Sequence, residues 1–176
     1  GGVATWLFES LLSKGLIDAV VCVGAGEEDG RLFEYKVMGD IETLRSAAGS
    51  RYYPVDMAKA VSVINTKERE LRYAVVGLPC SLKGLRLAME AMPRLRRRIV
   101  YTLGLVCGHM PNRFYTEYLA SLSGVEPGSL ASAQYRLKEN TARAGNYRFQ
   151  AVSADGTCGS TIPFANISNI WHDGYF

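Results

Sequence analysis

The sequence predicts an α/β fold in which a mixed or mostly parallel sheet is flanked by helices and followed by a β-rich C-terminal segment. Two observations predict this class. Between residues 3 and 122, short apolar runs rich in β-branched residues alternate with segments whose apolar residues recur at helical spacing. From about residue 133, three strand-like runs follow one another, separated by turns rich in Asn, Gly and Asp. We therefore expect an α/β core over 1–132 and a β-rich segment of the same domain over 133–176.

The individual elements follow from periodicity and from residues that begin or end helices. Apolar residues at helical spacing predict a helix over 3–14, with Gly15 as its C-terminal stop. Asp40 is a favourable N-cap residue for a helix over about 41–48. The four arginines between Arg94 and Arg98 are interpreted as a solvated surface turn, with binding of an acidic partner or a phosphate as the alternative. The other expected helices are 56–69, 81–92 and 111–122, and the expected strands are 17–23, 32–38, 72–78, 99–107, 133–138, 146–153 and 159–164.

Composition excludes several classes of protein. With 48% hydrophobic and 21% charged residues, the 176-residue chain can build an ordinary globular core. Its net charge of +3 is too small to indicate a nucleic-acid partner. No stretch reaches the roughly 18 apolar residues of a membrane helix, and no secretion signal stands at the N-terminus. We therefore expect a cytoplasmic protein without a membrane span or a disulfide framework.

Three predicted loops share one arrangement, because each leads into the N-terminus of a helix. They are Gly1-Gly2 before the first helix, 78–81 after a buried strand, and 106–111 after the next strand. In α/β proteins, ligands bind beyond the carboxyl ends of strands and beside helix N-termini, where free N–H groups and the helix dipole favour anions. The topology therefore predicts one site assembled from these loops.

Two cysteines, Cys80 and Cys107, stand at such strand ends. A helix N-terminus favours the thiolate, which is the form that attacks a substrate or binds a metal. The pair could share a metal or a cluster, could form a redox pair, or could be buried thiols, and their spacing matches no short metal motif. Cys22 and Cys158 have no neighbouring motif and are interpreted as buried thiols or left open. The sequence identifies no catalytic residue.

The loop Gly49-Ser50-Arg51-Tyr52 combines residue types that suit a phosphorylated planar ligand. Arginine binds phosphate through two parallel hydrogen bonds, and tyrosine stacks on flat heterocycles. The alternative is a glycine that ends a helix, followed by exposed polar residues.

A series of short motifs runs along the chain in a fixed order: Gly1-Gly2-Val3-x-Thr5, Lys14–Asp18, Gly49–Tyr52, Val75–Cys80, Gly84–Arg86, Leu103–Gly108 and Tyr135–Lys138. Taken in this order, the motifs resemble the coenzyme F420 hydrogenase/dehydrogenase β-subunit family over essentially the whole chain. The resemblance implies a flavin- and iron–sulfur-dependent oxidoreductase that transfers electrons between FAD, a [4Fe–4S] cluster and a partner. That partner would be a deazaflavin coenzyme, a ferredoxin or a hydrogenase-type subunit.

The resemblance also implies roles for particular residues. Cys80 and Cys107 match expected cluster ligands. Gly1, Gly2, Thr5 and the loop of Gly49, Ser50, Arg51 and Tyr52 match the flavin pocket, which would make residues 1–132 a flavin-binding core. Arg136 and Lys138 match a basic pair near the flavin phosphate or an acidic coenzyme.

The sequence departs from the family pattern in two places. Many relatives have glutamine where Ser81 follows the Pro-Cys pair. A four-iron cluster usually takes four thiolates, and the family supplies the others from a Cys-x-x-Cys segment that we expect beyond residue 176. The alternative function is a non-catalytic assembly or interaction module of the same fold, for example in a polysaccharide biosynthesis locus.

Overall fold

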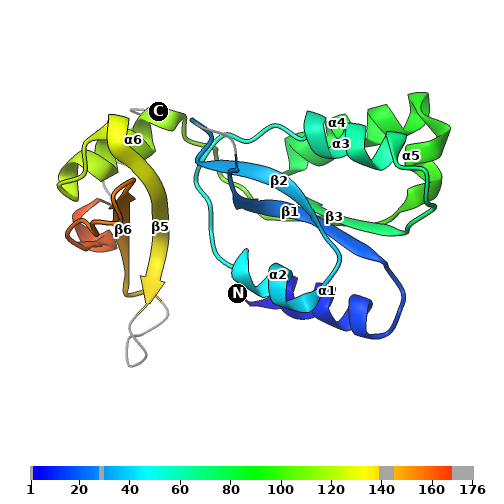
Figure 1. The fold of residues 1–176 in the computed structure, drawn as a ribbon, viewed down its shortest axis with the longest axis horizontal. Helices are drawn as coiled ribbons and strands as arrows, with labels where there is room; N and C mark the ends of the chain where they lie inside the picture. Colours follow the sequence, from blue (N-terminus) through cyan, green and yellow to red (C-terminus); the bar gives the residue numbers. More distant parts are fainter. Residues whose placement is uncertain (1, 28–29, 139–144, 168–176) are drawn as a thin grey trace. The chain divides into compact units, whose positions relative to one another are not determined.

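The computed structural model describes residues 2–27, 30–138 and 145–167, which belong to two compact units (Figure 1). Unit 1 combines Gly1–Glu27, Phe33–Ala48 and Val55–Gly108, and unit 2 combines Glu28–Leu32, Gly49–Pro54 and His109–Phe176. The two units reflect which residues contact one another, and they do not test the expected domain boundary. The boundary at residue 132 therefore stays a prediction. Within the described ranges, no helix is long and apolar enough to cross a membrane.

Unit 1 is built on a mixed four-stranded sheet, which confirms the predicted α/β class. Strands β1 (Ala19–Ala25) and β2 (Phe33–Met38) form an antiparallel hairpin, while β3 (Tyr73–Gly77) and β4 (Ile99–Gly104) run parallel to β1 in the order β2-β1-β3-β4. Strand β4 ends three residues before the predicted end at 107. It ends there because its partner β3 stops at Gly77, whose carbonyl accepts a last hydrogen bond from the Leu105 N–H at 3.0 Å.

Helices cover both faces of this sheet (Figure 1). One face packs against α3 (Ala58–Thr66), α4 (Pro79–Ala91) and α5 (Pro93–Arg98), and the other packs against α1 (Val3–Ser13) and α2 (Ile41–Ser46). The central strands are therefore apolar on both faces, as in other sheets buried between helix layers. Thus Val21 and Val75 point to the first layer, whereas Val20 and Ala74 point to the second.

The predicted helix ends are confirmed where a cap or a glycine was recognised. Gly15 follows α1 with φ = 62°, a left-handed conformation that glycine adopts without strain. The Asp40 carboxylate accepts a hydrogen bond from the Thr43 N–H at 2.8 Å and so caps α2. Helix α4 begins at Pro79, two residues before the predicted start, because proline suits the first position of a helix.

The prediction of a solvated turn at Arg94–Arg98 is wrong for the turn and for Arg98, whereas Arg94, Arg96 and Arg97 are exposed as predicted. These residues form α5, which follows Pro93 and turns Leu95 into the core with no exposed surface. The Arg98 side chain is 3% exposed, pairs with Glu70 and donates to the Ile64 carbonyl at 2.5 Å. A buried guanidinium is tolerated because these partners satisfy its charge and its N–H groups.

Unit 2 is an antiparallel three-stranded sheet with one helix. Its strands β5 (Leu130–Lys138), β6 (Tyr147–Ser153) and β7 (Ile162–Pro163) are ordered β5-β6-β7, and α6 (Arg113–Leu122) begins at the N-cap Asn112. The short helical turns η1 (Pro127–Ser129) and η2 (Phe164–Asn166) complete the unit. Strand β7 is shorter than the predicted 159–164, because Ser160 exchanges two hydrogen bonds with Ser123, at 2.7 and 2.6 Å, instead of pairing with β6.

We predict that Gly159→Ala destabilises unit 2. A Cβ at position 159 would lie 2.6 Å from the Ser123 carbonyl oxygen, which is backbone and cannot move without disrupting the end of α6. Overpacking of this kind costs about 2 kcal/mol of unfolding free energy, measured by urea denaturation. The matched control is Gly128→Ala, because a Cβ there has no atom within 4 Å. Equal stability of the two variants would contradict the close packing of Gly159.

Candidate cofactor-binding sites

The two candidate ligand cysteines lie at one edge of the sheet in unit 1. Gly77 and Gly104 are partners in the parallel register of β3 and β4, and Cys80 and Cys107 each follow their glycine by three residues. Cys80 is exposed in the first turn of α4, and Cys107 is half-buried in the segment after β4. The topology therefore brings both cysteines to the carboxyl edge of neighbouring strands, as the sequence pattern predicts.

The glycines before these cysteines allow α4 to begin close to the sheet. A Cβ on Gly77 would lie 3.2 Å from one methyl group of Leu82, and a Cβ on Gly104 would lie 3.6 Å from the other. Leu82 therefore packs over both strand ends and holds the first turn of α4, with Cys80, against this edge of the sheet.

A buried tyrosine contacts the turn that carries Cys80. Tyr35 of β2 lies near Ser81, Cys22 and Cys80. Burial, with a smaller contribution from these thiols, raises the pKa of Tyr35 to about 12. Its phenol is therefore neutral at physiological pH. Sequence reasoning missed Tyr35, because nothing in its strand distinguishes it from other buried aromatic residues.

The described residues supply two cysteines to this edge but no complete metal site. Within 2–27, 30–138 and 145–167, no group of three or more His, Cys, Asp or Glu side chains could hold a metal ion. Cys22 is buried with its sulfur 3.5 Å from that of Met38, which agrees with a structural thiol. Cys158 is exposed, so the interpretation as a buried thiol is wrong for that residue.

The flavin residues expected at the start of the chain belong to unit 1. Gly2 precedes α1 with φ = 87°, and Thr5 lies half-buried in its first turn. Gly1 lies outside the described residues. Their role in binding a flavin stays a prediction.

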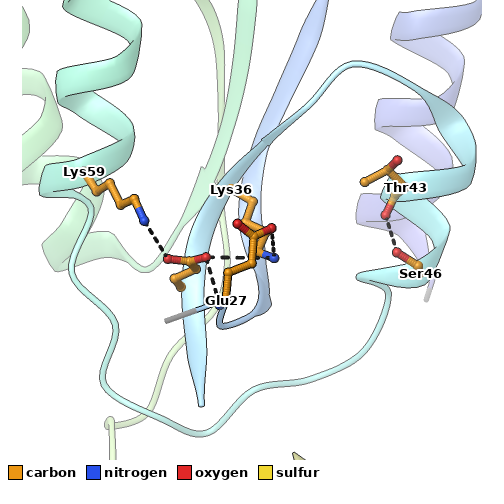
Figure 2. Close-up of polar contacts among 6 residues, drawn as sticks. Glu27, Lys36, Thr43, Ser46 and Lys59 are labelled. Atoms are coloured by element: carbon orange, nitrogen blue, oxygen red, sulfur yellow. Dashed lines mark hydrogen bonds and ion pairs between the residues drawn. The ribbon is translucent and has the colours of Figure 1, made fainter. Parts of the chain in front are cut away.

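An ion-pair network at the β1–β2 hairpin was also missed by sequence reasoning (Figure 2). Glu34 is 5% exposed, and its carboxylate lies 3.3 Å from the Lys59 ammonium and 3.8 Å from that of Lys36. Lys36 also pairs with Glu27 at 2.8 Å. The same close-up shows Ser46 donating to the Thr43 carbonyl at 2.7 Å in α2. Because a buried carboxylate needs compensating charge, we assign the Glu34 network a structural role in joining the hairpin to α3.

Unit 2 contains a pocket of about 130 Å³ that is partly open to solvent. Six aromatic rings and one guanidinium dominate its wall. The lining residues are Tyr52, Tyr115, Leu119, Tyr135, Arg136, Tyr147, Phe149, Phe164 and Ile167.

The predicted loop at 49–52 brings one of these rings to the pocket. Gly49 has φ = 145°, a backbone conformation that residues with a Cβ rarely adopt, which explains the glycine there. The Tyr52 ring meets Tyr135 edge to face, with 5.4 Å between the centroids. Ser50 and Arg51 do not line the pocket, and the Arg51 guanidinium donates to the Ser50 carbonyl at 3.2 Å.

A β-bulge brings the second predicted residue, Arg136, to the same pocket. Gln134 pairs with Gln150 and Leu137 pairs with Arg148, so Tyr135 and Arg136 together oppose the single residue Phe149. In a regular strand, consecutive side chains point to opposite faces, whereas here both residues line the pocket. Lys138, at the end of β5, is exposed and is not among the lining residues.

The guanidinium of Arg136 lies over aromatic faces at this pocket. It stands 5.0 Å from the centroid of the Tyr147 ring and 5.7 Å from that of Tyr52. Both distances fall within the range of cation–π attraction. The sequence pattern predicted Tyr52 and Arg136, and the structure brings these two together.

The other rings of the pocket were missed, although the sequence carried a signal for some of them. Tyr147 and Phe149 alternate on a predicted strand, which places both on one face. Tyr115 and Phe164 lie on other elements, and only the tertiary fold brings them to this wall.

Three tyrosines of the pocket, Tyr115, Tyr135 and Tyr147, have a pKa raised by burial and are neutral at physiological pH. Burial, with smaller contributions from Tyr52 and Tyr147, raises the pKa of Tyr115 to about 12. Burial also raises the pKa of Tyr135, whose hydroxyl shares a 2.5 Å hydrogen bond with that of Thr116. The Arg136 guanidinium is therefore the charged group of the pocket wall.

We predict that Tyr115 makes unit 2 less stable at high pH. Its folded pKa of about 12 lies above the ordinary value of 10, so between these values the unfolded chain loses a proton that the folded chain keeps. The free energy of unfolding should fall by up to about 2 kcal/mol over this window. Urea denaturation at pH 9 and 11.5 measures it. Tyr115→Phe should reduce this fall in the free energy of unfolding. Tyr118→Phe, at an exposed position, should leave it unchanged. An equal fall in the two variants would contradict the effect of burial.

Comparisons with known proteins place the chain in a family. Two family models of the coenzyme F420 hydrogenase/dehydrogenase beta subunit match it, the N-terminal model over residues 1–62 and the C-terminal model over residues 70–173. A search of curated proteins gave no match.

A solved structure shares the fold. It belongs to the F420-reducing [NiFe] hydrogenase complex from Methanosarcina barkeri, with 21% identity and a TM-score of 0.61. The match covers 96% of this chain and 56% of that chain. The order of the predicted motifs, the mixed sheet and the two matched models agree: the chain belongs to the coenzyme F420 hydrogenase/dehydrogenase β-subunit family.

Proposed function

We propose that the chain is part of a flavin- and iron–sulfur-dependent oxidoreductase. It would transfer electrons between FAD, a [4Fe–4S] cluster and a partner, which is a deazaflavin coenzyme, a ferredoxin or a hydrogenase-type subunit. The observation that carries the proposal is the placement of Cys80 and Cys107 after register partners on neighbouring parallel strands. Family membership supports the redox class.

The two cysteines fit half of a cluster site. Thiolates bind iron, and Cys80 is exposed in the first turn of α4, where its sulfur is accessible to a cluster. Four ligands are usual, so under this proposal the other two come from outside the described residues. The role of this chain is to hold two sulfur atoms at a fixed edge of the sheet, where Leu82 and the paired glycines set the position of α4.

The residues proposed to bind the flavin differ in how far the structure supports them. Bound FAD would supply hydride and single-electron chemistry. Tyr52 and Arg136 offer a ring face and a fixed cation in unit 2. Gly2, Thr5 and the Gly49–Arg51 segment would contribute backbone N–H groups and a guanidinium, and Lys138 would add a charge near a phosphate.

We predict that Cys80→Ser and Cys107→Ser each reduce the iron content of the anaerobically purified full-length protein by at least about half, because a missing thiolate weakens the cluster. Iron and flavin are quantified on the same sample, together with the visible absorption spectrum. Cys158→Ser is the matched control, because Cys158 is exposed like Cys80 but lies in unit 2.

Two results would count against this function. Equal iron in all three variants would defeat the ligand assignment. A colourless full-length protein, even after reconstitution with FAD, iron and sulfide, would favour the non-catalytic interaction module.

A further inference from the structure

The pocket of unit 2 is too small for the three-ring isoalloxazine of a flavin. At about 130 Å³ it is close in size to an engineered apolar cavity of about 150 Å³ that binds benzene. Whole small-molecule sites typically measure about 300–1,000 Å³. The pocket therefore accepts one aromatic ring, with any fused second ring at its open side.

The wall of the pocket selects for a planar and uncharged group. Rings from five different segments surround it: Tyr52 from the 49–52 loop, Tyr115 from α6, Tyr135 from β5, Tyr147 from β6 and Phe164 from η2. Aromatic faces and edges attract other π systems. The described residues that line it include no carboxylate, and the Arg136 guanidinium, which already lies over the Tyr52 and Tyr147 rings, repels a second cation.

The bulge at Tyr135 and Arg136 adds an anion-binding group to this aromatic wall. Arg136 is exposed as a residue, while its guanidinium lies over the rings of Tyr52 and Tyr147. These two rings hold the guanidinium in place, so little further side-chain entropy is lost when it binds an anion. Arginine presents a planar set of N–H donors that matches a phosphate.

We propose that this pocket binds a nucleoside phosphate, with the base inserted among the rings and the phosphate at Arg136. Two sources share this chemistry: the ADP half of FAD and a separate nucleotide. The identification of FAD as the source rests on the proposed function. The binding of a nucleoside phosphate in this pocket does not rest on it. In either case the isoalloxazine stays outside this pocket.

Isothermal titration calorimetry of the flavin-stripped full-length protein tests the proposal with ADP, UDP and FMN as probes. At least one of ADP and UDP should bind, and FMN should compete with it at least about tenfold more weakly, because three fused rings exceed the cavity. Tyr52→Ala and Arg136→Ala should each weaken nucleotide binding by about tenfold, the scale of one lost stacking or charge-assisted contact.

Matched variants separate binding from folding. Gln134→Ala alters an exposed residue two positions before Arg136 on the same strand, outside the pocket lining, and should bind nucleotide like the wild type. Tyr52→Phe keeps the ring and should retain most of the affinity. Thermal melting of every variant shows whether a loss of binding is a loss of fold.

Competition with FAD identifies the source. If FAD displaces the nucleotide, the site holds the ADP half of FAD; if both bind together, the site holds a separate nucleotide. The proposal is overturned if neither ADP nor UDP binds, if FMN competes as well as the nucleotide, or if folded Tyr52→Ala and Arg136→Ala bind it like the wild type. Nucleotide binding at this pocket does not depend on iron. A full-length protein that binds ADP but contains no iron would therefore contradict the redox proposal and leave the nucleotide proposal standing.

Discussion

The parallel pairing of β3 with β4 is the constraint on which the candidate cluster site depends. Because the two strands run in the same direction and pair Gly77 with Gly104, the segments that carry Cys80 and Cys107 leave the sheet at the same edge. A Cβ on Gly77 would press against Leu82 at 3.2 Å, whereas one on Gly104 would be in ordinary contact with it at 3.6 Å, so Leu82 sets how closely α4 approaches the end of β3. Packing of apolar side chains in unit 1 thus determines the position of the sulfur atoms that the proposed chemistry needs.

Unit 2 reaches its candidate site by breaking strand regularity instead. Without the extra residue opposite Phe149, Tyr135 and Arg136 would point to opposite faces of the sheet, and the pocket would lose either a wall or its cation. The bulge therefore accounts for two properties at once, a buried ring and a positioned guanidinium. Its cost is a locally interrupted ladder, which the packing of Tyr135 against Tyr52 and Phe149 offsets.

Sequence reasoning succeeded where local rules act and failed where tertiary contacts decide. The cap at Asp40, the glycine after α1 and the alternation of strands and helices were readable, because each depends on a few adjacent residues. Arg98 was misread because its partners Glu70 and Ile64 are more than 25 residues away in sequence. The pocket of unit 2 was found only in part, since a bulge and a convergence of rings from five segments leave no local pattern.

The departure at Ser81 stands beside a buried tyrosine of β2. Tyr35 is 8% exposed, and its phenol lies near Ser81 and Cys80. Burial raises the pKa of Tyr35 to about 12, so the phenol is neutral at physiological pH and places no negative charge beside Cys80. An ionised phenol would repel a negatively charged sulfur ligand by Coulomb interaction, whereas a neutral phenol does not. The buried tyrosine next to the departure at Ser81 is thus compatible with the proposed role of Cys80.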